Sequence, residues 1–210
     1  MIIILPLTSY LLHLVMTAFI DYLNENWLEV LGTIIGLIYL YQEIKASIYL
    51  WITGIVMPAI YTVVYWEAGL YADFGIQIYY IIAAIYGLFV WKFFRSKSGN
   101  TLQIKHLPLK KYPFFITTFV VSYAIIVYIL LTYTNSNVPY LDTFTTALSI
   151  VGLLLLARKY IEQWVAWVFV DAVCAGLYIY KGIYFTAGLY ALYTVLAIYG
   201  YIEWKRQMEK

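Results

Sequence analysis

The sequence predicts an all-α integral membrane protein with a 3+1+3 plan: two parallel three-helix bundles joined by a linker helix, with an extra hydrophobic helix at the N-terminus. Three observations support this prediction. Of the 210 residues, 64% are hydrophobic and only 11% charged, and the mean hydropathy of +0.81 is far above that of soluble domains. Seven long apolar segments follow the N-terminal stretch, and one nine-residue pattern occurs twice.

The apolar segments have the length of membrane-spanning helices. A helix needs roughly 20 predominantly apolar residues to cross a hydrocarbon core of about 30 Å, and the short alternating segments of membrane strands are not seen here. We therefore expect transmembrane helices near residues 26–43, 46–66, 70–92, 112–133, 142–157, 162–180 and 184–203.

The N-terminal stretch, residues 1–20, is long and free of charged residues, but it lacks the basic start and the cleavage site of a secretory signal peptide. We expect it to be retained and either to span the membrane or to lie at its interface. Its His13 is interpreted as an interface or packed residue. The predicted parts are an N-terminal hydrophobic helix (1–24), a first bundle (25–94), a basic cytoplasmic loop (95–111), a linker helix (112–135), and a second bundle with its tail (136–210).

The repeat supports two copies of one bundle. AIYGLFVWK, which begins at residue 84, returns as AIYGYIEWK 113 residues later, and the same offset pairs Trp51 with Trp164 without a gap. Duplicated units of this size indicate a duplicated three-helix bundle. Because three is an odd number, directly joined copies would be inverted, and the linker helix restores a parallel orientation. This plan is typical of transporters whose bundles rock around a site near mid-membrane.

The basic residues set the expected orientation. If the last helix ends in the cytoplasm, 12 of the 13 Lys and Arg residues lie inside and only Lys181 faces outward. We therefore predict a multi-pass protein of the bacterial cytoplasmic (inner) membrane with a cytoplasmic C-terminus. The net charge of +2 reflects this topology and not nucleic-acid binding. The basic loop, with His106, is expected to contact anionic lipid headgroups.

The copies differ most at the middle of their second helix, where the first has Pro58 and the second has Asp171. A carboxylate near the bilayer centre costs at least about 2.5 kcal/mol, so it normally faces a cavity or a partner. Trp164, Trp167 and Tyr178 share its helix face. An aromatic wall beside an acid suits a flat, positively charged heterocycle. The alternatives are an interhelical hydrogen bond for Asp171 and plain packing or interface anchoring for the tryptophans.

The third helix of each bundle carries a second candidate face. Asp73, Gln77 and Tyr80 fall at positions i, i+4 and i+7 and so share one face of the helix. Because polar side chains that face lipid are energetically unfavourable, we expect this face to line the pore. Gln77 is either a site residue or a helix-to-helix hydrogen bonder. The counterparts in the second bundle are Thr186, Tyr190 and Tyr193.

Three further positions have interpretations of their own. Pro58 lacks a backbone N–H and is expected to kink its helix, either as a hinge for bundle motion or as a static bend. Asp142, near the outer end of its helix, is interpreted as a helix-start charge, with a role in the site as the alternative. Cys174 is the only cysteine, which excludes an intramolecular disulfide and a cysteine-based metal site, and it is interpreted as a packing residue. No cofactor or metal is predicted.

Four stretches carry a resemblance to a known family: LEVLGTIIGLIYLY from residue 28, YADFGIQIYYIIAAIYG from 71, TTALSIVGLLLLARKYIEQWVAW from 145 and GLYALYTVLAIYGYIEWK from 188. With the 3+1+3 plan, they resemble the PnuC family of bacterial vitamin transporters over about residues 25–207. The resemblance implies a SWEET-like fold and facilitated diffusion of nicotinamide riboside, made one-way by a cytoplasmic vitamin kinase. Relatives of similar sequence carry thiamine or riboflavin.

The resemblance also implies site residues. The family's binding helix carries a tryptophan pair, matched here by Trp164 and Trp167, and an asparagine where this chain has Asp171. Nicotinamide riboside and thiamine are both cations, which the carboxylate of Asp171 is compatible with. Riboflavin is neutral and bulkier and is therefore less favoured by Asp171. We therefore expect uptake of a small cationic vitamin, nicotinamide riboside first and thiamine as the alternative. The expected partners are this substrate and membrane lipid, and a homo-oligomer such as a trimer is compatible with the plan.

Other classes of function fit the sequence less well. An enzyme is not expected, because HExxH, GxSxG and Gly-rich phosphate loops do not occur, and ATP-driven pumping by this chain alone lacks a motif for the same reason. A retinal photoreceptor needs a lysine in the middle of its last helix, and residues 184–203 contain none. A non-transporting receptor or membrane subunit remains as a distant alternative. Coupling to a proton or to sodium at Asp171 stays open.

Overall fold

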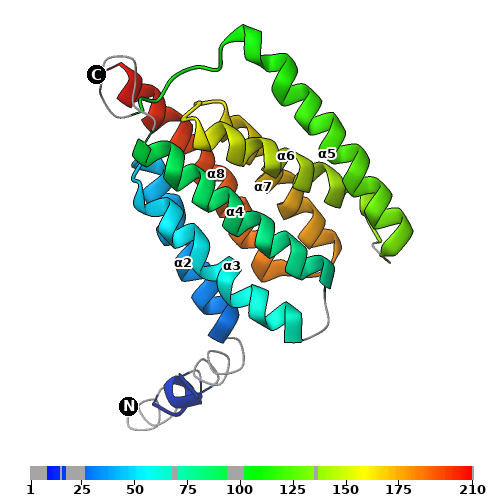
Figure 1. Cartoon of the computed structure of the whole chain (residues 1–210). Helices are drawn as coiled ribbons and strands as arrows, with labels where there is room; N and C mark the ends of the chain where they lie inside the picture. The colour runs from blue at the N-terminus through cyan, green and yellow to red at the C-terminus, as the bar shows by residue number, and fades with distance from the viewer. Residues whose placement is uncertain are drawn as a thin grey trace. The chain divides into compact units, whose positions relative to one another are not determined.

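The computed structural model describes residues 9–14, 16–17, 27–67, 71–93, 102–134 and 137–209. Residues 9–14 and 16–17 are helical. The elements that follow are α2 (Trp27–Ile44), α3 (Tyr49–Glu67), α4 (Tyr71–Phe93), the 3₁₀ turn η1 (Leu109–Lys111), α5 (Tyr112–Tyr133), α6 (Pro139–Ala157), α7 (Gln163–Tyr180) and α8 (Tyr184–Met208) (Figure 1). Within these ranges the all-α prediction is confirmed.

The observed helices follow the predicted apolar segments closely. Six described segments are long and apolar enough to cross a membrane: Tyr49–Glu67, Phe74–Phe93, Leu109–Tyr133, Pro139–Ala157, Gln163–Tyr180 and Tyr184–Met208. Val30–Ile44 in α2 is a shorter apolar helix. The observed helices are longer than predicted where a proline or a run of polar residues extends an end. α6 begins at Pro139, whose fixed φ suits a first helical turn, and α8 runs on through the polar residues after Tyr201.

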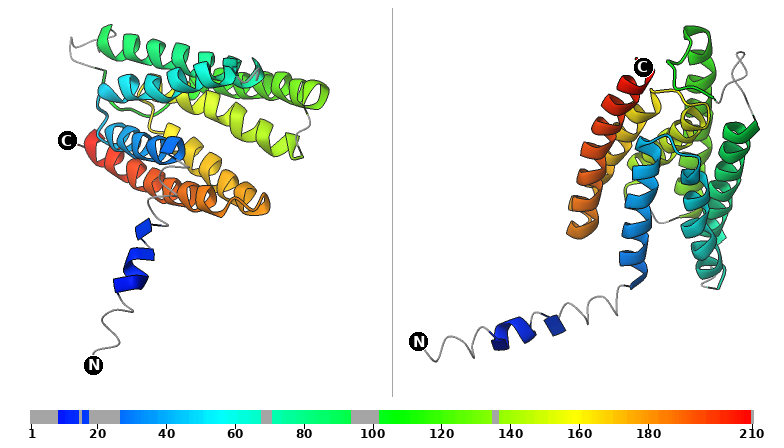
Figure 2. Two further views of the ribbon diagram at one scale, coloured as in Figure 1. Left: turned by 90° about the horizontal axis from the view of Figure 1, so that it is seen from below. Right: turned by 90° about the vertical axis from the view of Figure 1, so that its left-hand side faces the viewer.

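By its contacts the chain divides into two compact units, residues 1–38 and residues 39–210. In the first unit, the Thr17 hydroxyl donates a hydrogen bond to the His13 carbonyl oxygen (2.9 Å), and both side chains are exposed. In the second unit, α3 packs on α4, α7 on α8, α5 on α6, and α6 on both α7 and α4. Both views of Figure 2 show α7 and α8 side by side.

The repeat in the sequence is also a repeat of contacts. Two Trp–Gly–Trp triads, related by the 113-residue offset, are Trp51–Gly87–Trp91 in α3 and α4 and Trp164–Gly200–Trp204 in α7 and α8. A Cβ added at either glycine would lie 2.4 or 2.5 Å from the facing indole ring. The two tryptophans of each triad meet edge to face, with centroids 5.5 and 5.6 Å apart and both interplanar angles 88°. Only glycine allows this close approach of helix and ring.

Each triad is tied to the other copy by a hydrogen bond. The Trp91 indole N–H donates to the carbonyl oxygen of Leu156 (3.3 Å), and the Trp204 indole N–H donates to that of Glu43 (3.0 Å). Glu43 and Leu156 are themselves related by the offset of 113. We call this end of the second unit, where α4, α6 and α8 finish, the basic end.

The segment before α5 packs on the turn between α6 and α7 instead of lying free. Lys105 exchanges backbone hydrogen bonds with Lys159 and Ile161 (both 3.1 Å). The Glu162 carboxylate accepts a hydrogen bond from the backbone N–H of Leu107 and contacts Nδ1 of His106, both at 2.9 Å. The sequence interpretation of this loop as a headgroup-contacting segment therefore missed that its described part, from residue 102, is anchored to the helices.

Candidate functional site

Asp171 occupies the middle of α7 and is only 9% exposed. Among the described residues no basic side chain forms an ion pair with it. It instead lies within electrostatic range of Tyr190 and Tyr193 on α8. The site therefore begins with a buried carboxylate that has two tyrosines of α8 among its neighbours.

A box of tyrosines extends from Asp171 away from the basic end. The Tyr178 and Tyr190 rings lie 5.2 Å apart at 33°, and the Tyr190 and Tyr193 rings lie 5.8 Å apart at 68°. Tyr80 of α4 is within electrostatic range of Tyr178 and Tyr190. Four of the predicted tyrosines thus come together from α4, α7 and α8 around the predicted acid.

Cys174 lies inside this box, which the sequence interpretation as a packing residue did not anticipate. It is half-buried and lies within electrostatic range of Asp171, Tyr80 and Tyr178. The Thr145 side chain of α6 lies next to its thiol. Its position three residues after Asp171 on the same helix was the available signal.

The two predicted tryptophans occupy different environments. Trp164 is 0% exposed and packs inside its triad, and Trp51, at 1% exposed, has the same environment in the first copy. This geometry favours a packing role for Trp164. Trp167 is partly exposed and lies against Gly152 of α6, with ring carbons 3.4 Å from an added Cβ. It is four residues before Asp171 on the same face of α7. Of the pair, only Trp167 is partly exposed and lies outside the triads.

Two polar residues near Asp171 were missed by the sequence reasoning. Glu43 at the end of α2 is 2% exposed, and Gln163 at the start of α7 is 0% exposed. The Glu43 carboxylate interacts with Asp171, and the side chains of Gln163 and Trp167 lie beside it. The offset of 113 pairs Glu43 with Leu156 and Gln163 with Leu50, so comparing the two copies could have found both.

The remaining predicted residues are less informative. Gln77 is half-buried on α4, one turn before Tyr80, and Thr186 is half-buried in α8. Asp73 falls within α4, but its side chain is outside the described part of the structure. Pro58 is enclosed by a continuous α3, where the Thr62 hydroxyl donates to its carbonyl oxygen (2.6 Å). Its role as a hinge stays a prediction.

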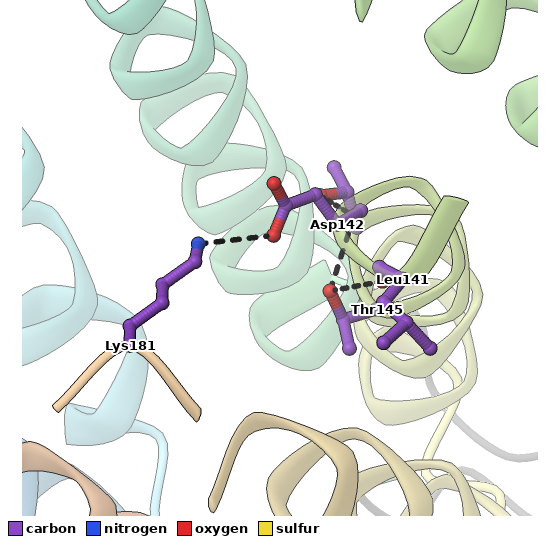
Figure 3. Close-up of polar contacts among 5 residues, drawn as sticks. Leu141, Asp142, Thr145 and Lys181 are labelled. Atoms are coloured by element: carbon purple, nitrogen blue, oxygen red, sulfur yellow. Dashed lines mark hydrogen bonds and ion pairs between the residues drawn. The ribbon is translucent and has the colours of Figure 1, made fainter. Parts of the chain in front are cut away.

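An ion pair marks the end of the site opposite the basic end. Lys181 Nζ lies 3.6 Å from Oδ1 of Asp142, joining the end of α7 to the start of α6 (Figure 3). The Thr145 hydroxyl donates to the carbonyl oxygens of Leu141 and Asp142, each at 3.1 Å. Asp142 is also within electrostatic range of Cys174. Asp142 therefore lies in the first turn of α6 and also near the tyrosine box.

The comparisons with known proteins agree with the motifs. The chain is 26% identical to the nicotinamide riboside transporter PnuC of Escherichia coli, covering 85% of each protein. It is 24% identical to the riboflavin/roseoflavin transporter RibM of Streptomyces davaonensis, covering 85% of this chain and 84% of that protein.

A solved structure and a family model extend this agreement. The crystal structure of the vitamin B3 transporter PnuC matches 96% of this chain and 91% of that one, with a TM-score of 0.70 at 20% identity, which establishes a shared fold. The resemblance drawn from the sequence motifs is confirmed. Because the model for nicotinamide mononucleotide transporters matches residues 26–206, this chain belongs to that family of multi-pass membrane transporters.

Proposed function

We propose that this transporter takes up nicotinamide riboside by facilitated diffusion, with the cationic ring held in the tyrosine box beside Asp171. The observation that carries the proposal is a buried carboxylate beside the rings of Tyr190 and Tyr193, with no basic partner among the described residues. A buried charge is costly unless it is paired, and a cationic ligand supplies the pair. The PnuC name of the similar proteins supports the choice of vitamin.

The aromatic rings add to this preference. A desolvated cation against an aromatic face gains about 2 kcal/mol or more, and the rings of Tyr178, Tyr190 and Tyr193 surround the position that such a cation would occupy beside Asp171. A neutral ring system, such as that of riboflavin, would leave the carboxylate unpaired. The thiazolium cation of thiamine would pair with the same carboxylate, so thiamine is the competing ligand to compare in binding experiments.

The paired triads and the packing of α5 on α6 support a SWEET-like 3+1+3 arrangement. Basic residues gather where helices end: Lys92 in α4, Arg158 after α6, and Lys205 and Arg206 in α8. By the positive-inside rule, we expect this end and the C-terminus to face the cytoplasm. We infer that the substrate enters past Asp142 and leaves at the basic end, where a vitamin kinase would trap it.

Asp171→Asn tests the proposal. In purified protein, this change should weaken nicotinamide riboside binding about 5- to 150-fold, a loss of about 1–3 kcal/mol, with folding intact. Riboflavin should lose much less. Calorimetry measures both affinities. Unchanged affinity for nicotinamide riboside in a well-folded variant would return Asp171 to a structural role.

Flux provides the second measurement. Liposomes containing the protein should equilibrate labelled nicotinamide riboside without ATP or an ion gradient, under a clamped membrane potential because the substrate is charged. Cys174, the only cysteine, adds a direct readout of occupancy: saturating substrate should slow its alkylation by a small thiol reagent. Accumulation driven by a pH or sodium gradient would contradict facilitated diffusion.

A further inference from the structure

Between Asp171 and the basic end lies a set of buried polar side chains that the tyrosine box does not use. We call it the inner polar cluster: Glu43 of α2 with Gln163 and Trp167 of α7. The side chains of Gln163 and Trp167 lie beside the Glu43 carboxylate. Among the described residues, however, Oε1 of Glu43, both amide atoms of Gln163 and Nε1 of Trp167 are buried and have no hydrogen-bond partner with normal geometry.

Such unsatisfied atoms are rare in folded proteins. Buried polar groups are nearly always hydrogen-bonded, because leaving one unpaired costs its full desolvation free energy. Four unpaired atoms from three adjacent side chains therefore indicate a cluster that a bound molecule completes. Glu43 and Gln163 are 2% and 0% exposed, so they are not solvated side chains at the surface.

The repeat shows that packing does not require this polarity. At the equivalent positions, the first copy has Leu50 for Gln163 and Gly54 for Trp167, and Leu156 is the equivalent of Glu43. Pro58 likewise replaces Asp171. The same scaffold is thus filled by apolar residues at one of these equivalent places and by polar residues at the other. A polar set that occurs at only one of these two equivalent places, with residues from both copies, is expected if it serves a single ligand.

The chemistry of the cluster matches hydroxyl groups. A carboxylate only accepts hydrogen bonds, an indole N–H only donates, and an amide does both. A vicinal diol can donate to Glu43 and also accept from Gln163 and Trp167, and carboxylates bind ribose hydroxyls in this way in nucleotide-binding proteins. Gln163 and Asp171 are eight residues apart on α7, or about 12 Å, which is the length scale of a planar ring joined to a pentose.

We propose that Glu43 and Gln163 form a sugar subsite, which binds the ribose hydroxyls while Asp171 and the tyrosine box hold the cationic ring. This inference rests on the proposed function and extends it to the second half of the substrate. Glu43 belongs to the first copy and Gln163 to the second. Relative movement of the two copies would therefore assemble the subsite around the sugar and open it for release.

A pair of ligands separates the two halves of the site. Nicotinamide riboside and N1-methylnicotinamide share the cationic ring, but a methyl group replaces the ribose in the second. Glu43→Gln and Gln163→Leu, the latter installing the residue of the first copy, should each weaken nicotinamide riboside binding by about 10-fold, the effect of losing a hydrogen bond to a charged or buried group. N1-methylnicotinamide affinity should change less than about 2-fold by the same reasoning.

Glu203→Gln is the matched control. It makes the same change on α8 near the basic end, where Glu203 contacts Arg206 and Gln207, and it should leave both affinities unchanged. Thermal unfolding identifies any variant that does not fold, and the other cluster variant then decides. Equal losses for both ligands, or no loss for either, would show that the cluster is structural or completed by water and would overturn the sugar subsite.

Failure of the underlying function has a different signature. If Asp171→Asn leaves both ligands unaffected, the cationic-ring site is wrong whatever Glu43 does. If the wild-type protein binds neither ligand, both proposals are overturned. If Asp171→Asn weakens both ligands while the cluster variants weaken neither, only the sugar subsite is lost.

Discussion

Replacing Trp164 by phenylalanine tests whether this residue belongs to the core or to the site. Trp164 is 0% exposed, and its Nε1 has no hydrogen-bond partner in the described part of the chain. Phenylalanine therefore removes no hydrogen bond and leaves a void of about one five-membered ring. Large-to-small changes of this kind cost about 1–3 kcal/mol, because the surrounding helices close only part of the cavity.

The matched control is Trp51→Phe in the first copy. Trp51 is 1% exposed, and its Nε1 is also without a partner among the described residues. Both variants should lower the midpoint of thermal unfolding in detergent by similar amounts. Neither should change the affinity for nicotinamide riboside by more than about 2-fold, measured by calorimetry below the unfolding temperature. A well-folded Trp164→Phe protein with at least a 10-fold loss of affinity, beside an unaffected Trp51→Phe protein, would refute the packing role.

Two further predictions follow from the same end of the protein. Gly200→Ala should destabilise the fold by about 1–3 kcal/mol through overpacking, because its Cβ would lie 2.5 Å from Trp164. Gly188→Ala should be neutral or slightly stabilising, because no described atom lies within 4 Å of its added Cβ; equal melting temperatures for the two variants would contradict this. Burial lowers the pKa of Lys159, in the turn before α7, to about 8. Between that value and the unfolded pKa near 10.4, the unfolded chain binds more protons, so stability should rise with pH across this window; Lys159→Met should lack this rise in thermal scans from pH 7 to 10.

The helices and the sequence repeat were predictable because they depend on the length, apolarity and spacing of segments along the chain. Segment length and apolarity located the helices, and an unbroken offset of 113 located the two equivalent Trp–Gly–Trp triads. The tyrosines around Asp171 were found for the same reason, since helical spacing decides which residues share a face. Residues that share a helix face because of their spacing were therefore largely predicted from the sequence.

Contacts between distant helices were not predictable in this way. Glu43 has the spacing of an ordinary charge near a helix end, and only the fold brings it to Gln163, 120 positions later. Trp164 was assigned to the site because it shares a face with Asp171, although Trp51 repeats it in the first copy. A residue that both copies share is better explained by scaffold, and the tertiary packing of the triads supports that reading.

The exchange of one large ring between helices shows how the two copies can share a scaffold and differ in chemistry. In the first copy Tyr39 on the first helix fills the space over Gly54 on the second, with a ring carbon 3.0 Å from an added Cβ. The offset reverses these sizes in the second copy, where Gly152 stands on the first helix and Trp167 on the second. The interhelical space stays filled by an aromatic ring in both cases. Because Trp167 brings its ring from α7, its N–H joins the helix face that carries Gln163 and Asp171, and the divergence that creates this polar face leaves the packing intact.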